Sequence, residues 1–431
     1  MATKPVNVNH EGYSRRLDTV QRILQRFGLK SAQISTIAYV EHCPFPFNNF
    51  IYKVELHTPA VPASFADNQP CTLPPPEEGV STVIVRMSNP LAEGLNNANR
   101  VENDVAAQHL VREALHAAGL PSLVPAVYAW ERCRYEEAPD ETGFGWTIGE
   151  FKPGSDLDGE FPTLAVDEKK QVMKQIADIF AAIQQAQLPQ SITQFGALTI
   201  DDEGQIVNGQ MPLLSGGPWD AYADVWVAKL RLQLEDADKS PLLQGWSLGG
   251  LREQINAWIE DGGVPRLLNG VNNNARVLVH GDLTMNNFLF DVTSKRITAI
   301  LDFDWAAVTH PADEFFTGLW DLGGGFDDRT AHMTSNILQG DFEEMPPNLD
   351  DKGLEAFGIA KAWNEAVAST GAARPSSIEK MDKILALREL ETLLCPFALG
   401  NEMMLKRISD EQKALKRQDT EAQIIEWFSR H

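Results

Sequence analysis

Two polar segments in the second half of the chain combine the residue types that phosphoryl transfer requires. The first lies within VLVHGDLTMNNFLFD (277–291) and places Asp282 five positions before Asn287. The second, LDFDWAAV (301–308), carries Asp302 at the end of the next apolar run. Phosphoryl transfer needs a carboxylate at the attacking hydroxyl, and a second carboxylate with an amide oxygen to hold Mg²⁺. The two segments supply all three groups.

Isolated Asp and Asn residues in loops are usually turn formers or caps, and that alternative has to be weighed. Here each polar segment is flanked by short apolar runs of the kind that form buried strands. Loops held between buried strands are rigid positions from which to present catalytic side chains. Two such loops at this spacing are hard to explain by turn chemistry, so the pattern favours a catalytic loop followed by a metal-binding loop.

Protein kinases carry H-R-D-x-x-x-x-N followed by D-F-G, and here Gly281 stands in place of the arginine. The segments closely resemble the aminoglycoside phosphotransferase and choline kinase-like family, in its fungal-type branch. The resemblance implies ATP and Mg²⁺ as cofactors, with Asp282 as the catalytic residue and Asn287 and Asp302 as metal ligands. It also implies that His280 orients the loop. Two further side chains are less sharply assigned: Glu314 as a structural tether of the loop, and Asp304 as either a metal contact or a loop former.

The resemblance further implies that the N-terminal part binds the nucleotide. Arg86 of VIVRM takes the position of the basic residue that reaches the phosphates, where many members have lysine, although an exposed strand charge would give the same pattern. Its partner on the next helix is Asp104, with Glu102 as the alternative. Asn48 or Asn49 would donate to phosphate from a hairpin that has no glycine. The absence of glycine prevents the close approach to phosphates that glycines allow. In GEFKPG, the carbonyl of Glu150 and the N–H of Lys152 would meet the adenine edge.

The pattern of elements predicts an α+β chain with a small sheet followed by a larger helical part, and the resemblance implies a protein-kinase-like, two-lobed fold. Strands are expected at 35–40, 49–56, 81–87, 124–130 and 145–151, and helices at 17–28 and 101–118. These elements predict a small mixed sheet in an N-lobe at 1–151, with a proline-rich surface insertion at 57–80. The remainder, 152–431, is predicted to be a mostly helical C-lobe that carries the catalytic loop (280–287) and the metal loop (302–304).

Composition limits the partners and the compartment. The 431 residues include 60 acidic and 37 basic side chains, for a formal net charge of −23, which argues against nucleic acid as a partner. A cationic small-molecule substrate is compatible with that charge. The four cysteines show no metal-type spacing and predict free thiols. No signal-length or membrane-length apolar run is present, so we expect a cytoplasmic protein without membrane partners.

The function predicted from these features is ATP-dependent phosphorylation of a hydroxyl on a small metabolite or aminoglycoside-like compound. Two alternatives stay open: a nucleotide-binding pseudokinase, which the glycine-free hairpin favours, and a transferase that moves another group from ATP. The acceptor has no readable motif. Several acidic residues follow the metal loop and are candidates to contact it: Asp313, Glu314, Asp321, Asp327 and Asp328.

Overall fold

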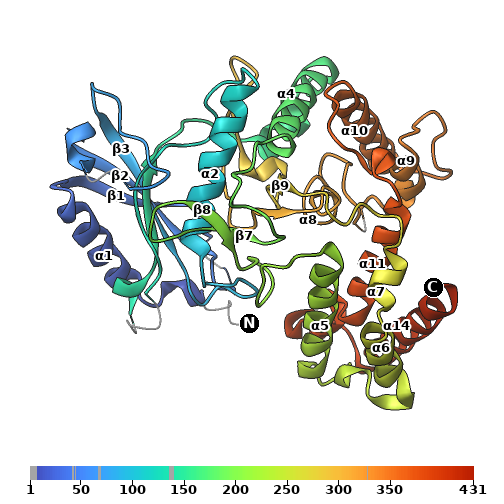
Figure 1. The fold of residues 1–431 in the computed structure, drawn as a ribbon. Helices are drawn as coiled ribbons and strands as arrows, with labels where there is room; N and C mark the ends of the chain where they lie inside the picture. The colour runs from blue at the N-terminus through green and yellow to red at the C-terminus, as the bar shows by residue number, and fades with distance from the viewer. Residues whose placement is uncertain (1–6, 41–42, 44, 67–68, 135–139, 328) are drawn as a thin grey trace.

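The computed structural model describes residues 7–40, 43, 45–66, 69–134, 140–327 and 329–431. Its N-terminal part contains a five-stranded sheet in the order β1-β2-β3-β5-β4, beside which lie the helices α1 and α2 (Figure 1). The bounds are β1 Ser31–Ile37, β2 Asn49–Ala60, β3 Val80–Ser88, β4 Val127–Glu131, β5 Trp146–Glu150, α1 Tyr13–Arg26 and α2 Arg100–Ala117. Every pairing in this sheet is antiparallel, so the expectation of a mixed sheet was wrong.

Strand β3 shows why this sheet forms. Its alternating residues Val83, Val85 and Met87 are fully buried, as expected of a strand with one face on a core. The helix α1 covers that face with a stripe that includes Val20 and Leu24. The residues between these apolar positions project from the opposite face of β3, which is therefore available to carry functional side chains.

The proline-rich segment is less loop-like than its composition predicts. Strand β2 continues to Ala60, which pairs with Val80 at the start of β3. Phe65 is buried against the ring of Tyr128, with centroids 5.5 Å apart. Trp130 donates its indole N–H to the carbonyl of Pro70 at 3.0 Å. Aromatic packing and a satisfied indole thus hold the insertion against the sheet, which proline content alone could not show.

The rest of the chain is mainly helical, as predicted, and four small antiparallel strand pairings interrupt it. The strands are β6 Ser155–Asp156, β7 Ala197–Ile200, β8 Ile206–Gly209, β9 Val277–Val279, β10 Phe288–Asp291, β11 Arg296–Ile300 and β12 Ala307–Thr309. The helices are α3 Leu157–Glu160, α4 Val166–Gln184, α5 Tyr222–Lys239, α6 Leu251–Glu260, α7 Gly263–Leu267, α8 Glu314–Thr317, α9 Thr334–Gln339, α10 Asp351–Ala368, α11 Met381–Leu394, α12 Phe397–Gly400, α13 Glu402–Leu405 and α14 Asp410–Arg430. No described helix has both the length and the apolar composition needed to cross a membrane.

This architecture is an α+β, protein-kinase-like fold with a β-rich N-lobe and a larger helical C-lobe (Figure 1). The lobe boundary after residue 151 stays a prediction. The chain leaves β5 at Glu150, and its next strand, β6, pairs with β10 rather than with the N-terminal sheet.

Two nested strand pairs bring the polar segments together. Strand β9 pairs with β12, and β10 pairs with β11, both antiparallel. The loop from β9 to β10 and the loop from β11 to β12 therefore join the same two pairs and must lie side by side. The N–H of Leu301 donates to the carbonyl of Asn287 at 2.9 Å and continues the ladder into both loops. The topology thus places a catalytic loop beside a metal loop.

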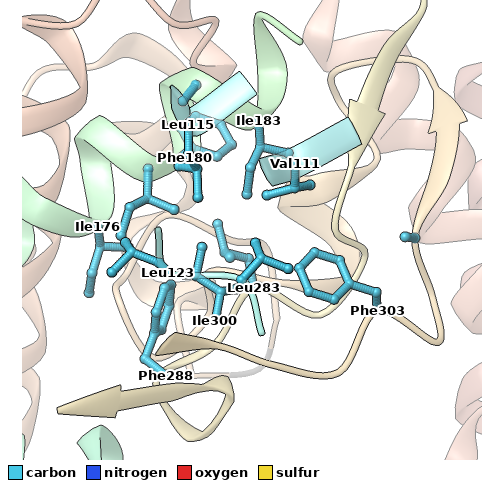
Figure 2. Close-up of a cluster of buried hydrophobic side chains, with 14 of the residues drawn as sticks. Val111, Leu115, Leu123, Ile176, Phe180, Ile183, Leu283, Phe288, Ile300 and Phe303 are labelled. Atoms are coloured by element: carbon cyan, nitrogen blue, oxygen red, sulfur yellow. The ribbon is translucent and has the colours of Figure 1, made fainter. Parts of the chain in front are cut away.

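A shared hydrophobic core supports these loops. Val111 and Leu115 of α2 pack in one cluster with Phe180 of α4 and with residues that flank the two loops, including Leu283 and Phe303 (Figure 2). Buried residues recur at the spacing of one helical face in the first part of α4, and from Ile179 to Ile183 every residue of this helix is buried. Because α2 belongs to this cluster, the helix that carries Asp104 is packed against the same core as the loops.

Candidate active site

The catalytic loop is organised by hydrogen bonds within the segment that the sequence singled out. Asn287 donates its side-chain amide N–H to the carbonyl of Asp282 at 2.7 Å and to its carboxylate at 2.9 Å. Burial raises the pKa of Asp282, and the hydrogen bonds from Asn287 and Thr284 oppose that rise. Asp282 and Asn287 therefore lie together, and their catalytic and metal-binding roles stay predictions.

His280 holds the loop through both ring nitrogens. Its Nε2 lies 3.1 Å from the carbonyl of Leu301, and its Nδ1 accepts the backbone N–H of Asp282 at 3.3 Å. Because a carbonyl can only accept, the proton must be on Nε2. Burial lowers the pKa of His280 to about 4. A neutral ring with both nitrogens engaged orients the loop and cannot shuttle protons near neutral pH, as the sequence suggested.

Glu314 tethers the same loop from the first position of α8. Its carboxylate accepts the backbone N–H of His280 at 2.7 Å and that of Gly281 at 3.2 Å. Burial raises its pKa to about 7, against the effect of these hydrogen bonds. Gly281 itself has φ +82°, and a Cβ there would lie 2.4 Å from the carbonyl oxygen of Trp305. The turn therefore requires glycine, which explains why arginine does not occupy this position.

The metal loop has two aspartates with different surroundings. Asp302 has φ +62°, a strained conformation for a residue with a Cβ and one that clusters at functional sites. Its side chain is 40% exposed, whereas that of Asp304 is 4% exposed. Burial and the neighbouring Asp304 raise the pKa of Asp302 to about 7, while Arg86 lowers it. Asp302 faces the open side of the site, and Asp304 is enclosed.

Arg86 connects both aspartates to helix α2. Its guanidinium lies 2.7 Å from Asp104, 2.9 Å from Asp302 and 2.8 Å from Asp304. Burial alone would lower the pKa of Arg86, but the three carboxylates outweigh burial and raise it above its ordinary value. The structure thus pairs Arg86 with Asp104. The alternative, Glu102, pairs with Arg132 at 3.3 Å instead.

Arg100 is a residue of the site that the sequence did not reveal, and Asn49, the alternative to Asn48 as a phosphate donor, contacts the same carboxylate as Arg100. Arg100, the first residue of α2, lies 2.9 Å from Asp304, and Asn49 donates to the same carboxylate at 2.7 Å. The two arginines and Asn49 hold the pKa of Asp304 well below its usual range, although burial opposes them. A basic residue in the first turn of a helix is unfavourable to the helix dipole, and that misfit was the available signal.

The remaining predicted nucleotide contacts lie beside the start of β2 and the end of β5, two interior strands of the N-terminal sheet. The side chain of Asn48 has no hydrogen-bond partner within the described part of the chain, and its carbonyl accepts from Arg100 at 2.5 Å. The backbone N–H of Glu150 donates to the carbonyl of Ala126 at 2.8 Å. The N–H of Lys152 donates to no described residue, while its ammonium contacts Glu150 at 2.9 Å. The Lys152 N–H is therefore free to meet a base edge.

The groups around Asp302 fit a magnesium ion. No cluster of three or more His, Cys, Asp or Glu suited to a metal occurs among the described residues. Mg²⁺, however, is commonly held by one or two carboxylates together with substrate phosphates and water. Asp302 offers a half-exposed carboxylate. Asn287 uses its amide nitrogen on Asp282, which orients its amide oxygen away from that partner.

The acidic residues that follow the metal loop are mostly engaged inside the protein. Asp313 accepts from Tyr222 at 2.9 Å and pairs with Lys229 at 3.1 Å. Asp321 accepts the N–H of Met285 at 2.6 Å, which ties a second point of the catalytic loop. Asp327 pairs with Arg329 at 3.0 Å, and Asp328 lies outside the described residues. Asp313 and Asp321 are thus engaged inside the protein and Asp327 in an ion pair, while contact of any of these acids with an acceptor stays a prediction.

A family model described as the phosphotransferase enzyme family matches residues 79–347, which include β3, α2 and both loops. The chain belongs to this family. It is a small-molecule phosphotransferase of the kinase type, acting on hydroxyl groups, as the sequence predicted. The matched range contains Arg86, Asp104, Asp282, Asn287 and Asp302.

Several solved structures are similar to this phosphotransferase at low sequence identity. A protein from Ralstonia eutropha described as a candidate aminoglycoside phosphotransferase is 16% identical, with 95% of this chain and 96% of that chain covered and a TM-score of 0.47. The ADP-bound aminoglycoside phosphotransferase APH(2'')-Ib is 11% identical, with 94% of this chain and 98% of that chain covered and a TM-score of 0.46. A Plasmodium vivax ethanolamine kinase is 11% identical, with 90% of this chain and 82% of that chain covered and a TM-score of 0.37. A search of curated proteins gives no match.

Proposed function

We propose that this phosphotransferase uses ATP and Mg²⁺ to phosphorylate a hydroxyl of a small metabolite or aminoglycoside-like compound. The observation that carries the proposal is the convergence of Asp282, Asn287 and Asp302 from two adjoining loops beneath Arg86. Phosphoryl transfer is catalysed mainly by positioning and by stabilisation of charge. Two carboxylates and an amide beside a guanidinium can provide both.

Asp282 is the group that meets the acceptor. As the acceptor oxygen forms its bond to the γ-phosphorus, its proton passes to the carboxylate of Asp282 and the bond to the leaving ADP oxygen breaks. The raised pKa of Asp282 makes this carboxylate a better base than an exposed aspartate. The bond from Asn287 fixes one of its oxygens at 2.9 Å, so the other oxygen is directed to the acceptor.

The nucleotide is held from the N-lobe. Arg86, oriented by Asp104, places its charge where the phosphates enter. Asn287 and Asp302 would hold the metal, whose positive charge would offset that of the phosphates. The carbonyl of Glu150 and the N–H of Lys152 receive the adenine edge, and Asn48 supplies a phosphate donor.

The acceptor is a small molecule, and a cationic one suits the formal net charge of −23. The four free cysteines support a reducing compartment, the cytoplasm. Transfer of another group from ATP has no observation in its favour beyond the fold.

The test separates catalysis from nucleotide binding. Asp282→Asn keeps the size of the side chain but removes its basicity, so we expect Mg²⁺-ATP to bind nearly as tightly as in the parent. Turnover with an acceptor found by screening alcohols and aminoglycosides should fall by about 10²–10⁴-fold. Asp291→Asn, on the same hairpin but in an exposed turn, is the matched control and should keep its activity.

Two results would contradict the proposal. Undiminished turnover in Asp282→Asn would remove the catalytic role of this carboxylate. A parent protein that binds Mg²⁺-ATP but phosphorylates nothing in a broad panel would favour a pseudokinase.

A further inference from the structure

Arg100 is a buried cation that joins three separate segments of the chain. Its side chain is 2% exposed. It donates to the carbonyl of Asn48 at 2.5 Å and to the side chain of Asn49 at 3.2 Å, both at the end of the β1–β2 loop. It also donates to the carbonyl of Asn89, just after β3, at 2.9 Å. Its remaining contact is the carboxylate of Asp304 at 2.9 Å.

Asp304 has no oxygen left for a metal in this arrangement. One carboxylate oxygen lies 2.8 Å from Arg86. The other lies 2.9 Å from Arg100 and accepts from Asn49 at 2.7 Å. All of these donors come from the N-lobe. Asp302, by contrast, is 40% exposed and forms an ion pair with Arg86. The two aspartates therefore have different roles. Asp302 is open to a ligand, and Asp304 binds side chains of the N-lobe.

The anchored partner is the loop that lacks glycine. The carbonyl of Phe47 accepts from the side chain of Asn89 at 2.7 Å, and the carbonyl of Asn48 accepts the N–H of Asn89 at 3.0 Å. A glycine-rich loop adjusts to phosphates by changing its backbone, which this loop cannot do as readily. Its C-terminal end is instead fixed by side chains to the metal loop on the far side of the site.

We propose that Arg100, Asn49 and Asp304 form a clamp that fixes the end of the β1–β2 loop relative to the metal loop. In this role Arg100 is a positioning residue for the phosphates and metal of the nucleotide. The planar fork of arginine is what the clamp requires, since it reaches several acceptors in different directions, whereas lysine presents a compact point charge. The inference rests on the proposed binding of Mg²⁺-nucleotide, and it adds a residue that acts without touching the nucleotide.

The experiment uses Arg100→Lys, which keeps the charge and loses the fork. Binding of Mg²⁺-ADP and of adenosine is measured by isothermal titration calorimetry, without any acceptor. We expect the Kd for Mg²⁺-ADP to rise about tenfold or more while the Kd for adenosine changes by less than twofold, because the clamp orders groups around the phosphates and not around the base. Arg417→Lys is the control: Arg417 is 17% exposed and holds Glu421 and the carbonyl of Leu242 in the C-lobe.

A second variant keeps the test decisive if Arg100→Lys folds poorly. Asn49→Ala removes one limb of the clamp and leaves the Arg100–Asp304 pair, so it should show the same selective loss for Mg²⁺-ADP at smaller size. Equal loss of both ligands would overturn the proposal, since a structural defect alone produces it. Parent-like binding of Mg²⁺-ADP by folded Arg100→Lys would also overturn it. A parent that binds no Mg²⁺-ADP would instead overturn the proposed function, and this inference with it.

Discussion

Replacing Glu314 with glutamine isolates the effect of one buried carboxylate on the stability of the catalytic loop. Glu314 is 2% exposed and accepts two backbone N–H groups of the loop. Glutamine resembles the protonated acid in size and charge. It keeps one acceptor oxygen, for the bonds from His280 at 2.7 Å and from Gly281 at 3.3 Å, and gives up the second acceptor, which lies 3.2 Å from the Gly281 N–H. That loss costs about 1 kcal/mol and does not vary with pH.

The pH-dependent part follows from the pKa of Glu314, which burial raises from 4.5 to about 7. Between these values the unfolded chain has released this proton while the folded chain retains it. The folded state then binds more protons, so the stability that Glu314 contributes falls as pH rises through this window. A difference of 2.5 pKa units corresponds to about 3 kcal/mol. Above pH 7 both states are ionised and the loss is complete.

The assay is urea unfolding followed by tryptophan fluorescence between pH 5 and pH 8, with circular dichroism as a second probe of two-state behaviour. We expect the unfolding free energy of Glu314→Gln, relative to the parent, to rise by about 2.5 kcal/mol across this range, because the part of the effect below pH 5 lies outside it. Glu113→Gln, at an exposed position of α2, controls for the loss of one negative charge. Parallel pH profiles for the parent and Glu314→Gln would refute the assignment of a raised pKa.

Three further predictions address the rest of the site. Asp302→Ala should abolish the extra thermal stabilisation that Mg²⁺ gives to the ATP complex while the chain stays folded. A thermal-shift titration with and without EDTA measures this stabilisation, and an unchanged Mg²⁺ effect would contradict the metal role. Arg86→Ala should weaken ATP more than adenosine, with partial recovery in Arg86→Lys, and equal losses would mean that Arg86 is structural. Gly281→Ala must accept a positive φ and a Cβ at 2.4 Å from a carbonyl oxygen, so its melting temperature should fall, which differential scanning calorimetry would detect.

The parts of the site that were predictable from sequence are those encoded within short segments. The spacing of Asp282 and Asn287 lies within one loop, and the apolar runs around it predict the strands that fix that loop. The pairing of Arg86 with Asp104 followed from the family resemblance, although Glu102 remained open until the structure placed it against Arg132. Local patterns carry this information because the chemistry and the element that presents it are adjacent in sequence.

The parts that were missed depend on contacts between distant segments. Arg100 and Asp304 are 204 positions apart, and a lone arginine at a helix start reads as a solvated charge. The extension of β2 to Ala60 was missed because prolines dominate the segment, and only its pairing with Val80 shows the strand. Propensity describes the isolated segment, whereas tertiary pairing decides its conformation.

Charge balance explains how a glycine-free loop can serve a phosphotransferase. Around Arg86 and Arg100 lie three carboxylates, those of Asp104, Asp302 and Asp304. Two arginines offset two of them, and the excess negative charge is on Asp302, the most exposed of the three. A cation that pairs with Asp302 therefore completes the balance and releases Arg86 toward the phosphates. Nucleotide affinity in this protein should then depend on side-chain charges and metal more than on backbone N–H groups of the loop.

Binding that depends on side-chain charges weakens as ionic strength rises. We therefore expect the Kd of Mg²⁺-ADP to increase steeply with added salt while that of adenosine stays constant, and equal salt dependence of the two would contradict this account.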